Sequence, residues 1–105
     1  MNPVTFSALA EPSRFHIVEL LRDKPYSVGE ISERLRIRQP QASKHLKVLA
    51  DAGIVSVSPQ ANQRIYALSP KKFQEIDRWL EKYRQLWEDR LNRLDAFLKK
   101  EIRRR

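Results

Sequence analysis

The sequence predicts a mainly α-helical protein with a small β-hairpin (α+β), and three observations lead to this prediction. Apolar residues recur at helical spacing in three short segments before Gly53, and each segment opens with a residue typical of helix starts. Two short β-type runs with a polar stretch between them come next. From Ser69-Pro70 a helical pattern then continues essentially unbroken to about Glu101. The expected order is helix, helix, turn, helix, β-hairpin, long helix.

Length and composition exclude several classes of protein. The chain has 105 residues, 21 Lys plus Arg against 13 Asp plus Glu, a formal net charge of +8 and no Cys. One domain is expected, without disulfides, Cys-ligated zinc, iron–sulfur clusters or a thiol nucleophile. Two His residues are too few for a three-His catalytic metal site. Because no signal peptide or long apolar run is recognisable, we expect a cytoplasmic protein with no membrane partner.

The first two helical segments have clear boundaries. Pro12 suits the first turn of a helix, where its missing N–H costs nothing, and that helix is expected to end near Asp23. Ser27-Val-Gly-Glu30 matches a capping box, in which the Ser hydroxyl and the Glu carboxylate each bind the other's backbone amide. The short helix that follows is expected to turn three apolar residues inward, namely Val28, Ile31 and Leu35. Residues 36–38 form the turn after it.

The third helical segment opens with Gln39-Pro40 and ends before Gly53, which suits a left-handed helix end. Its apolar residues lie at positions i, i+4 and i+7 and form one stripe, composed of Ala42, Leu46 and Leu49. The β-type runs after it cover residues 54–57 and 65–68, and the polar stretch Pro59–Gln63 is expected to be the turn between them.

The last helix is too long for one small domain to cover. At 1.5 Å per residue it would extend roughly 48 Å. Its apolar positions step by 3, 4, 4, 3, 4 and 4 residues, an eleven-residue repeat that keeps the stripe nearly straight: Leu80, Tyr83, Trp87, Leu91, Leu94, Leu98 and Ile102. A second set widens this face: Phe73, Ile76, Trp79, Leu86 and Phe97. We expect a second copy of the chain to cover the stripe, the alternative being a helix folded back on its own core.

Two short helices joined by a tight turn and followed by a hairpin constitute a winged helix-turn-helix. If Leu46 points inward, Lys44 points almost directly outward, flanked by Pro40, Gln41 and Lys47, with Ser43 nearer the edge. Gln, Lys and Ser are residue types that read base edges or phosphates in DNA. His45 lies beside the buried stripe and suits phosphate contact or packing better than base reading.

Charge supports DNA as the partner. Residues 34–50 contain five basic side chains and no acid, whereas residues 1–33 carry three basic and five acidic ones. A local positive run over the turn and second helix is what phosphate contact requires. The alternative is a solvated helical face. Arg64 in the second strand is expected to contact phosphate or the minor groove, and Gln60, Asn62 and Gln63 at the wing tip are weaker candidates.

Two further features have open interpretations. The aromatic residues Trp79, Tyr83, Trp87 and Phe97 are either interface anchors or the lining of a pocket for a small-molecule effector. The basic tail adds phosphate attraction or is a solvated end: Lys99, Lys100, Arg103, Arg104 and Arg105. An enzyme is not expected, since the chain has only two Gly residues, hence no Gly-rich phosphate loop, and no paired carboxylates on a common face.

The stretch from Gln41 to Val55, QASKHLKVLADAGIV, resembles the recognition helix and first wing strand of the ArsR family of bacterial winged-helix repressors. Residues 8–14 leading into 17–21 resemble the opening of the same family, and residues 64–68 resemble its second wing strand. The resemblance covers roughly residues 6–70. It implies a homodimer that binds an inverted-repeat operator and blocks transcription. By position it implies DNA contact from Gln41, Ser43, Lys44, His45 and Arg64.

The sequence departs from the metal-sensing members of this family. Where they carry Cys-x-Cys, this chain has Ser27-Val28-Gly29, which cannot bind a soft metal. Another group uses Asp and His along the last helix, but here Asp77 is followed two residues later by Trp79, and residues 70–105 contain no His. The stretch from Trp79 to Leu98 is similar to metal-free members. No metal or other cofactor is therefore expected.

These observations predict a winged helix-turn-helix DNA-binding region over residues 1–69. A C-terminal dimerisation helix with a basic tail is expected over 70–105, within the same compact domain. The expected function is a sequence-specific, homodimeric transcriptional repressor; the alternatives are an organic-ligand-gated repressor of the same fold and a winged-helix protein–protein adaptor. The expected DNA-contacting residues are Arg38, Gln39, Gln41, Ser43, Lys44, His45, Lys47 and Arg64. The expected dimer contacts are Leu80, Tyr83, Trp87, Leu91, Leu94 and Leu98.

Overall fold

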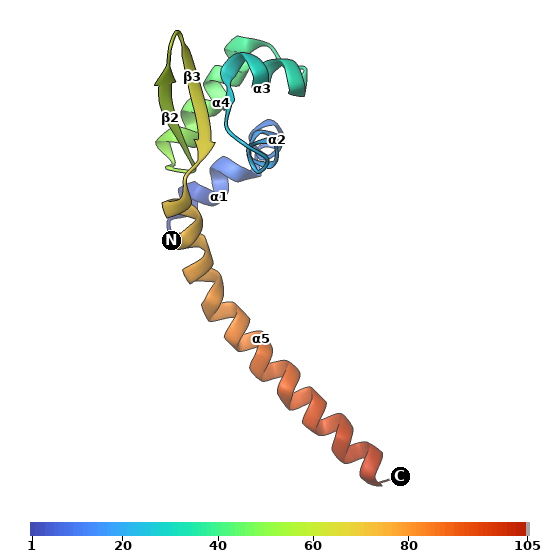
Figure 1. Cartoon of the computed structure of the whole chain (residues 1–105). Coiled ribbons are helices and arrows are strands. Elements are labelled where there is room, and N and C mark those ends of the chain that lie inside the picture. The colour runs from blue at the N-terminus through green and yellow to red at the C-terminus, as the bar shows by residue number, and fades with distance from the viewer. Residues whose placement is uncertain (105) are drawn as a thin grey trace. The chain divides into compact units, whose positions relative to one another are not determined.

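The computed structural model describes residues 1–104, except for the side chain of Arg104. The order of elements is α1 (Pro3–Ala10), α2 (Pro12–Leu21), β1 (Tyr26–Ser27), α3 (Val28–Leu35), α4 (Gln39–Asp51), β2 (Val55–Gln60), β3 (Gln63–Leu68) and α5 (Pro70–Arg104), as Figure 1 shows. The predicted α+β class with a small wing is confirmed. Two compact units are present, Met1–Phe73 and the described residues from Gln74 onward. Helix α5 begins in the first unit and makes up the second.

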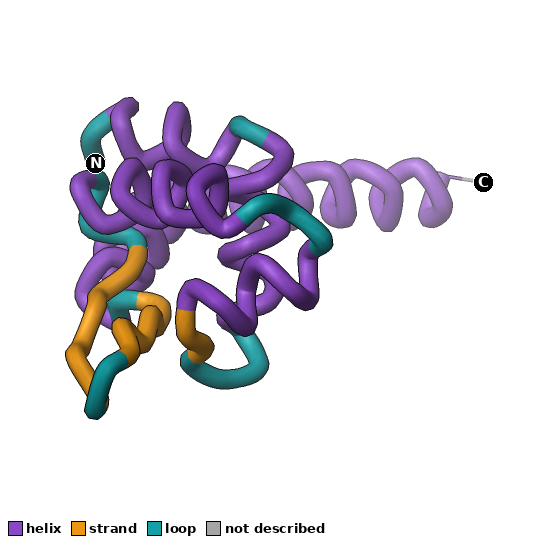
Figure 2. The backbone as a smooth tube through the Cα atoms, turned by 90° about the horizontal axis from the view of Figure 1, so that it is seen from above, coloured by secondary structure: helices purple, strands orange, loops and turns teal. Residues whose placement is uncertain are grey.

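The sheet is antiparallel, with β3 between β1 and β2. Figure 2 shows the strands of the first unit in orange and its helices in purple. Strand β1 was not predicted, because two residues are too few to display the alternation by which a strand is recognised. The expected turn Pro59–Gln63 is also wrong in length, since only Ala61 and Asn62 lie between the strands. Pro59 is accommodated because β2 pairs on one side only, with β3.

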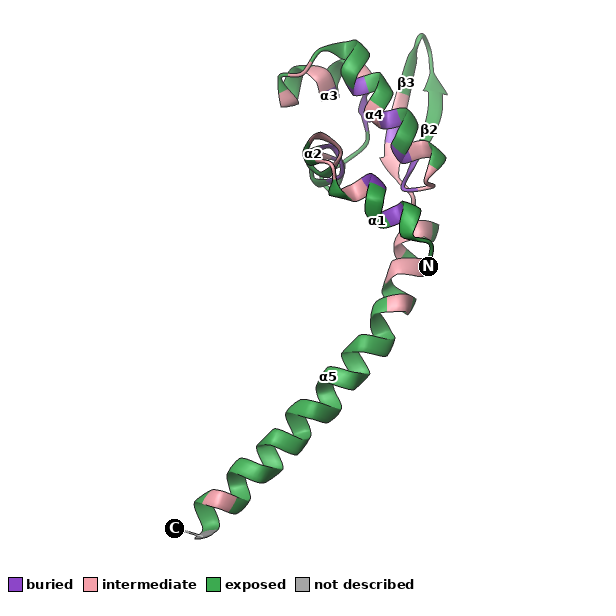
Figure 3. Ribbon diagram, turned by 180° about the vertical axis from the view of Figure 1, so that it is seen from behind, coloured by how far each residue is buried: buried purple, intermediate pink, exposed green. Residues whose placement is uncertain are grey.

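The core of the first unit lies between the helices and the sheet (Figure 3). Ile17 of α2, Ile31 of α3 and Ile54 before β2 are fully buried. The stripe predicted on α4 is confirmed, since Ala42, Leu46 and Leu49 are all 0 % exposed. Helical periodicity therefore identified the buried face of α4 correctly, and the inward residues expected on α3 are fully buried at Ile31 and partly buried at Val28 and Leu35.

Helix α1 was not predicted. Its apolar residues do not form one stripe, because Val4 and Phe6 are exposed while Thr5 and Ala8 face the core. The pattern of large side chains is consequently misleading, because the fully buried positions are the small residues at i and i+3, with Leu9 packed partly buried beside them. Asn2 provides the N-cap, its side chain accepting a hydrogen bond from the amide of Val4 at 3.0 Å.

Local capping agrees with the sequence at both ends of the helix-turn-helix. The predicted capping box at the start of α3 is present in both directions. Gly53 ends α4 with a φ of 76°, a conformation that costs little only for glycine. A Cβ at this position would lie 3.1 Å from Cε of Lys72, so the first turn of α5 also approaches closely here. Phe73 of the same turn packs against the core.

The second unit is the part of α5 from Gln74 onward. Its large apolar side chains are exposed nearly throughout, as the colouring in Figure 3 shows. Ion pairs form between neighbouring turns of the helix, among them Lys99 with Asp95 at 3.1 Å and Arg84 with Glu81 at 3.4 Å. Among the described residues, α5 and every other helix lack the run of apolar residues that crossing a membrane requires.

Candidate nucleic-acid interface

Helix α4 has two faces of opposite character. One carries the buried stripe of Ala42, Leu46 and Leu49 and holds the helix against the core. The other is solvent-exposed and carries hydrogen-bonding and cationic side chains, namely Gln41, Ser43, Lys44 and Lys47. An amphipathic helix of this kind can enter a major groove while remaining anchored to its domain.

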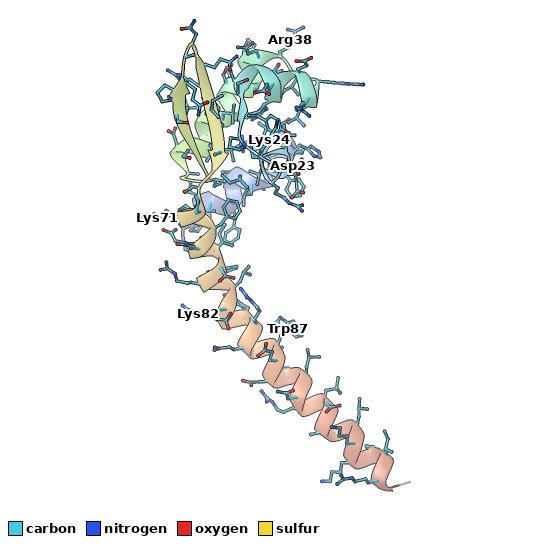
Figure 4. The ribbon with its side chains drawn as sticks, viewed as in Figure 1. Asp23, Lys24, Arg38, Lys71, Lys82 and Trp87 are labelled. Carbon is cyan, nitrogen blue, oxygen red and sulfur yellow. The ribbon has the colours of Figure 1, made fainter. Side chains whose placement is uncertain are left out.

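The turn before α4 keeps the N-terminus of this helix open to solvent. Arg36 ends α3 in the left-handed conformation, with φ 56° and ψ 43°. The hydroxyl of Ser32 then donates a hydrogen bond to the carbonyl of Ile37, which fixes the turn. Arg38 is the N-cap residue of α4 in extended conformation, and its side chain makes no capping hydrogen bond. Figure 4 shows Arg38 at the same end of the first unit as the turn between β2 and β3.

The wing contributes Arg64, which pairs in register with Pro59. Because side chains alternate along a strand, Arg64 lies on the same face of the sheet as the buried Tyr66, the face turned toward the helices. A hollow of about 460 Å³ opens there between the wing and the N-termini of α3 and α4. Its lining residues are Ser27, Val28, Gly29, Gln39, Asn62, Gln63 and Arg64. Sequence reasoning did not place the start of α3 beside Arg64, because only long-range strand pairing brings them together.

The cations on this side of the unit have no acidic partners. Arg38, Lys44, Lys47 and Arg64 are exposed, and none of them forms an ion pair with another residue of the described part of the chain. Acidic side chains instead pair with other residues, for example Glu19 with Arg22 at 3.0 Å. Four unpaired positive charges are therefore available to an anionic partner such as a phosphate backbone.

His45 is arranged differently from the other predicted site residues of α4. Its side chain is 24 % exposed, and its Nδ1 lies 3.7 Å from Oε2 of Glu11. The same Nδ1 lies 3.5 Å from Nη1 of Arg14. The structure thus brings together three residues from α4 and the start of α2. Sequence analysis did not single out Glu11 or Arg14, since nothing in the local pattern links them to α4.

Ser27 and Glu30, at the start of α3, engage each other's backbone. The Oγ of Ser27 accepts a hydrogen bond from the amide of Glu30 at 3.2 Å, and the Glu30 carboxylate accepts one from the amide of Ser27 at 3.0 Å. Both side chains are thereby engaged in the capping box. Over residues 1–104, no group of three or more His, Cys, Asp and Glu side chains is arranged to hold a metal ion.

The predicted dimer contacts are exposed on the second unit. The exposed fractions are 41 % for Leu80, 46 % for Tyr83, 59 % for Trp87 and Leu91, 52 % for Leu94 and 50 % for Leu98. Trp79 and Tyr83 contact each other, with ring centroids 4.8 Å apart. In the basic tail, Lys99 pairs with Asp95. Arg105 and the side chain of Arg104 lie outside the described residues.

Comparison with known proteins gives consistent matches. The family model described as "Bacterial regulatory protein, arsR family" matches residues 11–57. A region of 65 residues, 62 % of this chain, is 42 % identical to 61 % of the HTH-type transcriptional regulator Rv2034 of Mycobacterium tuberculosis. A region of 80 residues, 76 % of this chain, is 31 % identical to 88 % of the transcriptional repressor SdpR of Bacillus subtilis. The chain thus spans about three fifths of the first relative and most of the second.

A solved structure shares the fold. The crystal structure of the ArsR family transcriptional regulator RHA00566 superposes with a TM-score of 0.71 at 29 % identity, covering 81 % of this chain and 93 % of that one. The matched proteins are transcriptional regulators rather than enzymes.

Proposed function

Because this chain belongs to the ArsR family of bacterial regulatory proteins, we propose that it is a sequence-specific DNA-binding transcriptional regulator. In the full proposal it is a homodimeric repressor that binds a palindromic operator without a metal and acts in the cytoplasm, where bacterial DNA lies. The observation that carries the proposal is the exposed face of α4, whose cations have no acidic partners within the described residues.

Each exposed side chain has a role in the proposal that follows from its chemistry. Helix α4 enters the major groove, where Gln41 suits an adenine edge and Lys44 suits a guanine edge or a phosphate. Ser43 can bond to either kind of base. Arg38 and Lys47, both exposed, are proposed to contact phosphates beside the groove.

The hollow between the wing and the helix N-termini is proposed to follow the DNA backbone. Arg64 supplies a positive charge on one side of it, and Gln39 supplies an amide donor on the other. Contacts of this kind hold the protein in register on the duplex and carry no sequence information themselves.

A second copy of the chain is the proposed cover for the apolar stripe of α5. At about 100° per residue, the six predicted contacts fall within an arc of about 80°, and all are at least 41 % exposed in the single chain. A continuous exposed apolar stripe of this length marks an interaction surface. A two-fold dimer would place half-site centres about one helical turn apart, roughly 34–36 Å, or a multiple of this. Residues 1–69 would then bind DNA, and residues 70–105 would hold the dimer together.

Metal-independent binding is proposed from the donor set. The residues that stand in place of Cys-x-Cys are Ser27, Val28 and Gly29, and the Oγ of Ser27 accepts a hydrogen bond from the amide of Glu30. Soft metals favour thiolate ligands, and the chain has no Cys; its two imidazoles, His16 and His45, lie on different helices. Addition of Zn²⁺ or a chelator is therefore expected to leave the affinity for DNA unchanged.

Selection of bound duplexes from a random-sequence pool tests the proposed function. A palindromic consensus is expected, and Lys44→Ala or Gln41→Ala should each lower the preference for it by about 1–3 kcal/mol, because each removes a side chain that reads a base edge. Lys71→Ala, an exposed lysine on the first turn of α5, serves as the matched control and should retain the preference. If the unmodified protein enriches no duplex, the proposal fails. If the two α4 variants bind selected and random DNA as before, α4 is not the reading element.

A further inference from the structure

The side chain of His45 turns from α4 toward the start of α2, where it meets two charged groups. Its Nδ1 is 3.5 Å from Nη1 of Arg14 and 3.7 Å from Oε2 of Glu11. The contact joins residues 31 positions apart in the chain. It therefore connects α4 to the junction of α1 and α2, away from the exposed face that carries Lys44.

Glu11 and Arg14 are themselves held rigidly by backbone contacts. The Oε2 of Glu11 accepts a hydrogen bond from the amide of Arg14 at 2.9 Å, which makes Glu11 the N-cap of α2. The Nε of Arg14 donates to the carbonyl of Ala8 in the last turn of α1 at 2.7 Å. Because the amide hydrogen bond from Arg14 holds the pKa of Glu11 below its ordinary value of 4.5, this carboxylate is charged at neutral pH. The pair thus presents a fixed negative and a fixed positive group to the imidazole.

Either tautomer of His45 finds a partner in this arrangement. With a proton on Nδ1, the ring faces the carboxylate of Glu11 as a donor, and without one it can accept from the guanidinium of Arg14. In both cases Nδ1 is directed into the protein. The buried neighbours on α4 are apolar and hold one face of the helix against the core. The contacts of His45 add a directional polar restraint at the edge of that face.

We propose that Glu11 and Arg14 act through His45 as positioning residues that set the rotation of α4 about its axis, and hence the direction in which Gln41 and Lys44 point. In this assignment His45 does not contact DNA, in contrast to the role that the family resemblance implies. The inference rests on the proposed function, because it concerns the presentation of a DNA-reading face.

The first experiment measures preference for the duplex selected from the random pool over a scrambled duplex of equal length. Glu11→Gln removes the charge that faces the imidazole, and His45→Gln removes the imidazole itself. Each is expected to reduce this preference by about tenfold, the size of one polar contact. The double variant should lose no more preference than the more strongly affected single variant, because both changes act on the same contact between Glu11 and His45. Affinity for the scrambled duplex and its dependence on salt should remain, since no phosphate-binding group is removed.

Two further variants separate positioning from folding. Glu11→Asp retains a good N-cap and the negative charge but shortens the reach toward His45, so it should lose preference while α2 remains capped. Glu19→Gln removes the same charge from the same helix at a residue that pairs with Arg22, and it should behave like the unmodified protein. Loss of preference in Glu19→Gln, or full preference in Glu11→Asp, would contradict the assignment.

A second readout needs no DNA. The chain has two histidines, His16 and His45, so its proton NMR spectrum contains two imidazole Hε1 signals, and His45→Gln identifies one of them. That signal should move in Glu11→Gln and stay in place in Glu19→Gln. An unmoved signal in Glu11→Gln would overturn the contact, and so the positioning role.

The results distinguish failure of the inference from failure of the proposed function. Additive losses in the double variant, together with a flatter salt dependence for His45→Gln, would make His45 a phosphate-binding residue and overturn the positioning role. If the unmodified protein enriches no duplex, the proposed function fails and the positioning role falls with it. The selection with the unmodified protein alone reveals that outcome, before any variant is made.

Discussion

Ser27 and Glu30 cap each other's backbone at the start of α3. The Ser27 hydroxyl accepts from the Glu30 amide at 3.2 Å, and the Glu30 carboxylate accepts from the Ser27 amide at 3.0 Å. Ser27 also pairs with Ile65 in the sheet. The reciprocal cap therefore holds the beginning of α3 next to the strand that carries Arg64, and both border the hollow beneath the wing.

The capping box is expected to make stability depend on pH. Hydrogen bonds from Ser27, first from its amide, hold the pKa of Glu30 below its ordinary value of 4.5. The folded state thus favours the charged form of Glu30. The stabilising contribution of this carboxylate to the free energy of unfolding is complete above its unfolded-state pKa. It is lost as pH falls through its folded-state pKa. The pKa of Glu11 is lowered mainly by the hydrogen bond from the amide of Arg14, so Glu11 also makes the folded state less stable as pH falls.

Denaturant unfolding measured between about pH 3 and 6 checks this prediction. Glu30→Gln can still accept a hydrogen bond but cannot titrate, so its unfolding free energy should fall less steeply in acid than that of the unmodified chain. Glu33→Gln, an exposed change on the same helix, is the control and should keep the original slope. Equal slopes for Glu30→Gln and the unmodified chain would contradict the prediction.

Replacing Arg36 by glycine is expected to stabilise the fold. Arg36 has a φ of 56°, a left-handed conformation that is costly for residues with a Cβ and typical of glycine at helix ends. Arg36→Gly should therefore raise the unfolding free energy by about 0.5–1 kcal/mol. Arg36→Ala removes the same charge at the same position but keeps a Cβ, so it relieves no strain. Stabilisation by both variants, or by neither, would show that backbone strain at Arg36 is not the cause.

Arg64 is expected to act on DNA affinity rather than on sequence preference. Arg64 lines the hollow and forms no ion pair with an acidic residue in the described part of the chain. Arg64→Ala should weaken binding to all sequences alike and reduce the slope of log affinity against log salt by about one. Fluorescence anisotropy at several salt concentrations measures this slope, with Arg22→Ala as a control because Arg22 pairs with Glu19. A selective loss on the preferred duplex would instead make Arg64 a base-reading residue.

A single charge on the stripe of α5 is expected to dissociate the proposed dimer. Leu91 is 59 % exposed in the single chain and lies near the middle of the predicted interface. Burying an unpaired carboxylate against apolar side chains is costly, so Leu91→Glu should give a monomer by light scattering at micromolar concentration. Asn92→Glu adds the same charge on the opposite side of the helix and should remain dimeric. A monomeric unmodified protein would refute the dimer itself.

Features that depend on neighbouring residues were predictable from the sequence. Pro12 and Pro40 start their helices, Gly53 ends α4, and the buried stripe of α4 follows from apolar spacing. These signals are local because caps, φ preferences and helical periodicity act within a few residues. The exposed face of α4, with Lys44 opposite Leu46, was identified in the same way.

The sequence by itself therefore determined the helix-turn-helix, the wing and the residues that α4 exposes. Only the tertiary structure decided that α1 packs through Thr5 and Ala8, that β1 joins the sheet, and that His45 turns to Glu11 and Arg14. Each of these features depends on side-chain shape or on pairing between residues far apart in the chain. Such contacts leave no periodic pattern in the sequence around either of the two residues. Packing in three dimensions, and not local propensity, selects them.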